Sequence, residues 1–88
     1  MYSKEIKIVN PSGIHARPAS QVCSKASQYE SSIKFKRKGD EDVCDAKSIV
    51  HLLMFGFMQG EEVIIIAEGH DEEKAVEELA ELIAMLDE

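Results

Sequence analysis

The sequence has little that could cross-link the chain or anchor it in a membrane. It contains no tryptophan and only two cysteines, Cys23 and Cys44, which form no CxxC pair. Two cysteines are too few for a disulfide framework, so we expect a reducing compartment, the cytoplasm. No apolar run approaches the roughly 18 residues of a membrane-spanning helix, and the opening MYSKEIKIV lacks the apolar segment of a signal peptide.

Acidic residues outnumber basic residues, and this limits which classes of molecule the protein can bind. The chain has 10 Lys and Arg against 17 Asp and Glu, a net charge of −7. That charge opposes general binding to nucleic acid or to an anionic membrane surface. Most of the basic residues lie in the first half of the chain: Lys4, Lys7, Arg17, Lys25, Lys34, Lys36, Arg37 and Lys38. A local basic patch suits an acidic protein partner or a phosphoryl group.

The length of 88 residues indicates one domain, residues 1–88, with a thin core. Such a chain has no room for a deep substrate cleft, so we expect its function to take place on the surface. A monomer is the plain expectation.

Hydrophobic periodicity predicts alternating strands and helices. Residues 2–9 alternate with period two, as in a half-buried strand, and NPSG ends them in a turn. From Ala16 to about Tyr29 the apolar residues recur every three or four positions, which indicates a helix with Pro18 in its first turn. SIKFKRK and VCDA read as a strand and a short return strand joined by KGDED.

The second half continues the same alternation. Ser48 is an expected N-cap for the short apolar helix IVHLLMF, which ends at Gly56. EEVIIIAEG is apolar on both faces and should lie inside the sheet. Asp71 is expected to cap a last amphipathic helix. The order β-α-β-β-α-β-α predicts an α+β, two-layer α/β sandwich with its helices on one face.

The stretch PSGIHARPAS places His15 just before a helix start. The first N–H groups of a helix have no intrahelical partner, and they bind phosphate readily. A neutral imidazole there is a nucleophile, and Arg17 offers a fork that suits phosphate oxygens. A polar turn residue beside a solvated arginine is the competing interpretation, and the residues alone leave the two nearly balanced.

A metal site and a hydrolase are weaker hypotheses. His15, His51, His70, Cys23 and Cys44 show no recognised ligand spacing. Ser20 lies near His15, but no residue supplies an orienting acid together with an oxyanion hole. We expect no metal.

The segments GIHARPAS and AKSIVHLLMFG resemble the two signatures of HPr, the histidine-containing phosphocarrier family of the bacterial phosphoenolpyruvate:sugar phosphotransferase system. The resemblance covers the whole chain. It implies an open-faced sandwich with an antiparallel sheet of strand order 1-4-2-3 and three helices on one side. It implies that His15 accepts phosphate on Nδ1 from Enzyme I and passes it to IIA components of sugar permeases. Arg17 and the backbone N–H groups of Ala16 and Arg17 would steady the phosphoryl group, with no cofactor and no free-standing enzyme activity.

The second signature implies regulation and docking. Ser48 matches the serine that HPr kinase/phosphorylase modifies in some members, and the modified form would recruit a catabolite-control repressor. The docking candidates are Ile49, Val50, Leu52 and Leu53, since an exposed apolar patch marks an interaction site. His51 and Met54 depart from the family pattern and put partner choice in doubt. A regulatory paralogue that acts mainly through Ser48 is the alternative function.

Overall fold

The computed structural model describes residues 1–88 and contains the expected order of elements. Four strands alternate with three helices: β1 (Tyr2–Lys7), α1 (Ala16–Ala26), β2 (Ser32–Arg37), β3 (Cys44–Asp45), α2 (Ile49–Phe55), β4 (Glu62–Glu68) and α3 (Glu72–Ala84). No helix combines the length and the apolar character needed to cross a membrane.

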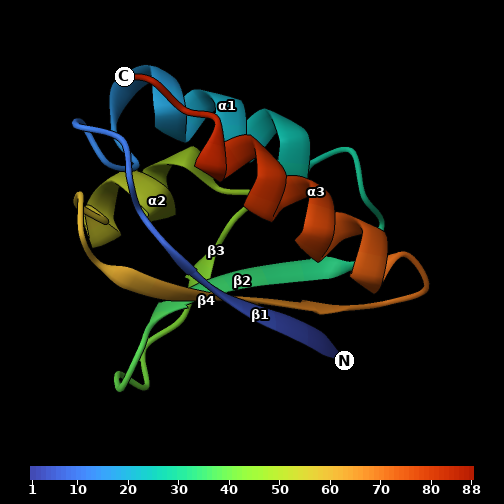
Figure 1. The fold of residues 1–88 in the computed structure, drawn as a ribbon. Coiled ribbons are helices and arrows are strands. Elements are labelled where there is room, and N and C mark those ends of the chain that lie inside the picture. The colour runs from blue at the N-terminus through green and yellow to red at the C-terminus, as the bar shows by residue number, and fades with distance from the viewer.

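The strands form one antiparallel sheet in the order β1-β4-β2-β3, which confirms the expected topology (Figure 1). The most apolar strand, β4, lies between β1 and β2, with Ile65 opposite Lys4 on one side and Phe35 on the other. A strand in that position has no free edge, so β4 lies inside the sheet as expected, with Ile64 and Ile66 only partly buried on the face away from the helices.

All three helices cover the same face of the sheet, and the other face is open (Figure 1). Alternation along β4 turns Val63, Ile65 and Ala67 toward the helices, and all three are fully buried. The inward stripe of α3 packs against them, with Leu79 and Ile83 among its buried residues. The core is therefore a single layer of side chains between the sheet and the helices.

Helix α1 ends earlier than its apolar spacing predicted. The helix stops at Ala26, and Tyr29 lies in the following turn although its side chain is buried. The Ser27 hydroxyl donates to the carbonyl of Cys23, and the next backbone bonds span only three residues, as in Tyr29 to Ala26. The turn keeps the ring in the core without another helical turn.

Asp71 precedes α3 as predicted, but its side chain does not cap that helix. Its carboxylate accepts hydrogen bonds from the hydroxyl and N–H of Ser31 and from the N–H of Glu30. The Ser31 hydroxyl is the main reason that the pKa of Asp71 falls to about 2. The aspartate therefore ties the start of α3 to the start of β2.

Candidate functional site

His15 occupies the N-cap position of α1 with an extended backbone, at φ −131° and ψ 162°. Its side chain makes no capping hydrogen bond and is exposed. The imidazole is therefore accessible at the surface, at the helix start where the sequence predicted it.

Ala16 follows with a φ of +49°, and it is the only residue other than glycine with a positive φ. The left-handed conformation costs an L-residue roughly 1–2 kcal/mol. No backbone hydrogen bond uses the N–H of Ala16 or Arg17, and Pro18 has none to offer. The first N–H with an intrahelical partner is that of Ala19, which donates to the carbonyl of His15 at 3.3 Å. Two free donors therefore stand beside the imidazole, as an anion site requires.

The loop before His15 is fixed to the segment after α2. The N–H of Ile14 donates to the carbonyl of Phe57 at 2.9 Å, and Ile14 is fully buried. Asn10 donates from its side chain to the carbonyl of Gly13 at 2.8 Å. Gly13 has a φ of +65°, and a Cβ there would lie 2.2 Å from the Phe57 oxygen. Only glycine lets the two backbones approach this closely.

Gly56, at the end of α2, leaves open the space beside the His15 ring. It ends α2 in the left-handed conformation, with φ at +59°, and a Cβ there would lie 3.5 Å from Nε2 of His15. His15 therefore has the start of α1 on one side and the end of α2 on the other. The sequence pattern predicted the first neighbour, and only the tertiary structure reveals the second.

Arg17 is exposed, and its guanidinium Nε lies 3.4 Å from a carboxylate oxygen of Glu88. The carbonyl of Glu88 also accepts from the N–H of Ser12 at 2.8 Å, which brings the end of the chain beside the His15 loop (Figure 1). With the Arg17 side chain 72% exposed, this ion pair is worth at most about 1 kcal/mol, so a phosphoryl group could replace the carboxylate. Sequence reasoning missed Glu88, because nothing local links it to the motif.

Helix α2 packs beside α1, and Ser48 caps it as predicted (Figure 1). The Ser48 hydroxyl accepts from the N–H of His51 at 3.2 Å. Ile49, Val50 and Leu53 are exposed by 39%, 62% and 40%, so they give an apolar surface to the helix whose C-terminal end lies near His15.

Leu52 was wrongly included among the docking candidates. It has no exposed surface, because it lies on the side of α2 that faces the core. Leu52 is the one residue of α2 that is fully buried, whereas Ile49, Val50, Leu53 and Met54 are exposed.

His51, which departs from the family pattern, is only partly exposed. Its Nδ1 accepts from the N–H of Asp45 at 3.1 Å, and its ring meets Phe55 edge-on at 5.4 Å. An accepting Nδ1 places the proton on Nε2. His51 therefore connects α2 to β3.

The two cysteines do not form a disulfide, and neither belongs to a metal cluster. The Cys23 thiol donates to the carbonyl of Lys47 at 3.2 Å. Cys44 is fully buried, and burial raises the pKa of its thiol to about 11. No group of three His, Cys, Asp or Glu side chains could hold a metal ion.

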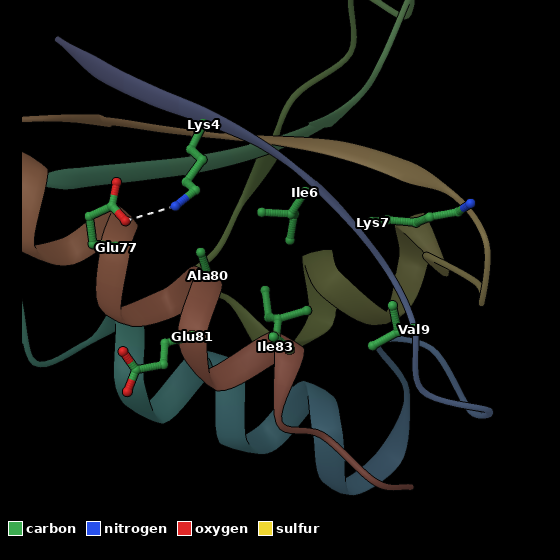
Figure 2. Close-up of a pocket in the computed structure, with 9 residues that line it drawn as sticks. Lys4, Ile6, Lys7, Val9, Glu77, Ala80, Glu81 and Ile83 are labelled. Carbon is green, nitrogen blue, oxygen red and sulfur yellow. Dashed lines mark hydrogen bonds and ion pairs between the residues drawn. The ribbon is translucent and has the colours of Figure 1, made fainter.

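The largest groove lies away from His15, between β1 and the second half of α3 (Figure 2). It measures about 480 Å³, and Ile6, Val9, Ala80 and Ile83 are among the residues that line it. Figure 2 shows the ion pair that Lys4 forms with Glu77 at one end, with the two atoms 2.8 Å apart. His15 thus lies on an open surface rather than in a cavity.

Comparisons with known proteins agree with this geometry. Residues 2–85 match a family model described as "PTS HPr component phosphorylation site". The phosphocarrier protein HPr of Haemophilus influenzae is 38% identical over 99% of this chain and 100% of its own length. The crystal structure of HPr-C-His from Thermoanaerobacter tengcongensis has a TM-score of 0.90 at 39% identity and covers 96% of this chain and 92% of that one. Crh, the Bacillus subtilis catabolite repression protein, has a TM-score of 0.75 at 31% identity, with 96% and 94% covered.

Proposed function

The chain belongs to the HPr family of phosphotransferase-system phosphocarriers, and from this premise we propose that His15 carries the phosphoryl group. The observation that carries the proposal is the exposed imidazole beside the unpaired N–H groups of Ala16 and Arg17. We propose phospho-Enzyme I as the donor and IIA components of sugar permeases as acceptors, as family membership implies.

The chemistry requires one nitrogen lone pair and a stabilised phosphoryl group. We propose that Nδ1 of neutral His15 attacks phosphorus, while the bond between phosphorus and the donor's imidazole nitrogen breaks and its electron pair returns to the donor. The proton stays on Nε2, the nitrogen that approaches Gly56. Transfer of this kind needs positioning and charge stabilisation more than covalent machinery.

Three groups support the phosphoryl oxygens in this proposal. The N–H groups of Ala16 and Arg17 are unpaired, and the Arg17 guanidinium can leave Glu88 for a dianion. The positive end of α1 contributes about 0.3–1 kcal/mol at an exposed site. This modest stabilisation suits a carrier, because a tightly held phosphoryl group would not be passed on.

We propose that partners dock on α2 through Ile49, Val50 and Leu53. Their exposure, and the packing of α2 against the helix that His15 caps, support this assignment. Aliphatic side chains on a short helix bury apolar area when a partner covers them, which is how small interfaces gain affinity. Enzyme I and IIA would use the same surface in turn.

We propose that phosphorylation of Ser48 regulates this docking. A phosphate would add about −1.5 to −2 charges at the start of α2, next to the apolar contact residues. The similarity to Crh motivates testing HPr kinase/phosphorylase and a catabolite-control repressor as partners. The carrier function is favoured over a purely regulatory one because His15 and its two donors are intact.

The test is to incubate the protein with Enzyme I, Mg²⁺ and radiolabelled phosphoenolpyruvate. We expect an acid-labile label that maps to His15 and is lost in His15→Ala. His70→Ala is the matched control, because His70 is also exposed but lies outside the motif, with its Nε2 3.1 Å from a carboxylate oxygen of Glu30. A label that survives in His15→Ala, or that never forms while an authentic carrier is labelled in parallel, would contradict the proposal. Labelling of Ser48 by ATP and HPr kinase/phosphorylase tests the regulatory part separately, and cell fractionation tests the cytoplasmic location.

A further inference from the structure

The active-site loop rests on residues 56–58, which connect α2 to the turn before β4. Phe57 accepts the Ile14 hydrogen bond, and its oxygen lies where a side chain on Gly13 would have to go. A side chain on Gly56 would meet the His15 ring, because its Cβ would lie 3.5 Å from Nε2. Any group that fixes residues 56–58 therefore also constrains the loop that carries the imidazole.

Arg37, the last residue of β2, reaches this segment from the sheet. Its Nη2 donates to the carbonyl of Phe55 at the end of α2, and its Nε donates to Glu61 at 2.5 Å. Its guanidinium carbon lies 4.8 Å from the centre of the Phe57 ring. Glu61 in turn accepts from the N–H of Met58 at 2.6 Å. The ion pair between Arg37 and Glu61 therefore contacts Phe55, just before the segment, and Met58, its last residue. It also contacts the ring of Phe57 within the segment.

The ion pair between Arg37 and Glu61 is more buried than the pair between Arg17 and Glu88 at the surface. The side chains of Arg37 and Glu61 are 30% and 29% exposed, whereas Arg17 in its pair with Glu88 is 72% exposed. The Arg37 guanidinium also holds the pKa of Glu61 below its usual range. A lysine could not make the same set of contacts, because only the planar fork of arginine donates in several fixed directions and stacks on rings.

We propose that Arg37 is a positioning residue for phosphoryl transfer: together with Glu61 it holds residues 56–58 in the place that orients the His15 ring. The inference rests on the proposed function of His15. Arg37 acts through the backbone and the Phe57 ring, and it contacts neither His15 nor the group transferred.

The test compares Arg37→Met with Lys38→Met. Lys38 is the next residue, and it pairs with Glu5 and Glu62 at the surface, so its variant removes the same charge without touching residues 56–58. The first measurement is the ¹⁵N spectrum of the His15 ring in the unphosphorylated protein, across pH. The second is kcat and KM for phosphorylation by Enzyme I.

We expect Arg37→Met to shift the His15 ring signals and to lower kcat about tenfold, with a smaller change in KM, because misplacement of a reacting group is costly. Lys38→Met should match the wild type in both measurements. A folded Arg37→Met protein with unchanged ring signals and unchanged kcat would overturn the proposal.

Glu61→Gln and Arg37→Lys replace Arg37→Met if circular dichroism shows that the methionine variant does not fold. Both keep a polar side chain at the site, and both should move the ring signals in the same direction by a smaller amount. Unchanged signals in both would overturn the proposal. Failure of the wild type to accept phosphate would overturn the proposed function instead, and the ring spectra would still show whether Arg37 orients the imidazole.

Discussion

Replacing Gly13 with alanine should damage the fold and the active site together. Gly13 has a φ of +65°, and its new Cβ would lie 2.2 Å from the oxygen of Phe57 and 2.9 Å from the Cα of Met58. Both neighbours are backbone atoms, so no side-chain rotation relieves the contact. The loop must move away, and the hydrogen bond from Ile14 to Phe57 is strained or lost.

The magnitude follows from two separate costs. The left-handed backbone costs alanine about 1–2 kcal/mol. Crowding in a packed region typically costs about 1–3 kcal/mol more. Gly39→Ala is the matched control, because Gly39 also has a positive φ, +85°, but nothing lies within 4 Å of its missing Cβ. We therefore expect Gly39→Ala to lose about 1–2 kcal/mol and Gly13→Ala about 2–5 kcal/mol.

Urea denaturation of the wild type, Gly13→Ala and Gly39→Ala measures the loss in free energy of unfolding, with the m-values compared among the three proteins. A domain of this size loses about 4–8 °C in Tm for each kcal/mol, so a thermal scan gives a second estimate. Phosphorylation by Enzyme I should slow in Gly13→Ala and stay normal in Gly39→Ala. Equal losses of stability in the two variants would refute the argument that close approach to Phe57, and not φ alone, requires glycine.

Three further predictions follow from burial and hydrogen bonding. Leu52→Ala should lower the free energy of unfolding by about 2–5 kcal/mol in urea titration. Leu53→Ala should change it by less than about 1 kcal/mol and should instead raise KM for Enzyme I. The reverse pattern would make Leu53 the core residue and Leu52 the docking residue. His51→Ala leaves the N–H of Asp45 without its acceptor and should cost about 1 kcal/mol, and no loss would show that water replaces the imidazole. Because the pKa of Asp71 is lowered to about 2 in the folded state, its contribution to stability is present above pH 4 and disappears as pH falls through about 2. Asp71→Asn should therefore lose less stability than the wild type between pH 4 and pH 2, and parallel losses would contradict this.

Much of the fold could be predicted because its signals are local. The period of two in β1 and the stripe of α3 decide which residues face the core, whereas the continuous apolar run of β4 predicted only its place inside the sheet. The strand order came from resemblance to a family, since periodicity alone does not determine which strands pair. The end of α1 and the partner of Asp71 were missed, because a three-residue turn and a contact with Ser31 across the chain decide them.

The candidate site was predictable only where its residues are neighbours in sequence. His15, its two N–H donors and the Ser48 cap follow from motifs at helix starts. The supporting residues do not, because Gly56, Arg37 and Glu88 reach His15 or its neighbours from distant parts of the chain. The burial of Leu52 was missed for a related reason: a seven-residue apolar helix carries too little polar pattern to reveal its exposed face.

The place of β4 in the sheet has a consequence for the order in which the protein folds. Both β1 and β2 pair with β4, and Tyr2 meets Ala67, so most of the sheet depends on contacts between distant parts of the chain. Such topologies fold slowly, because a large loop must close before its contacts stabilise it. During synthesis β1 emerges first and has no strand to pair with until β4 follows. A chain that stops before Glu62 should therefore be cleaved rapidly by a protease that spares the full sequence.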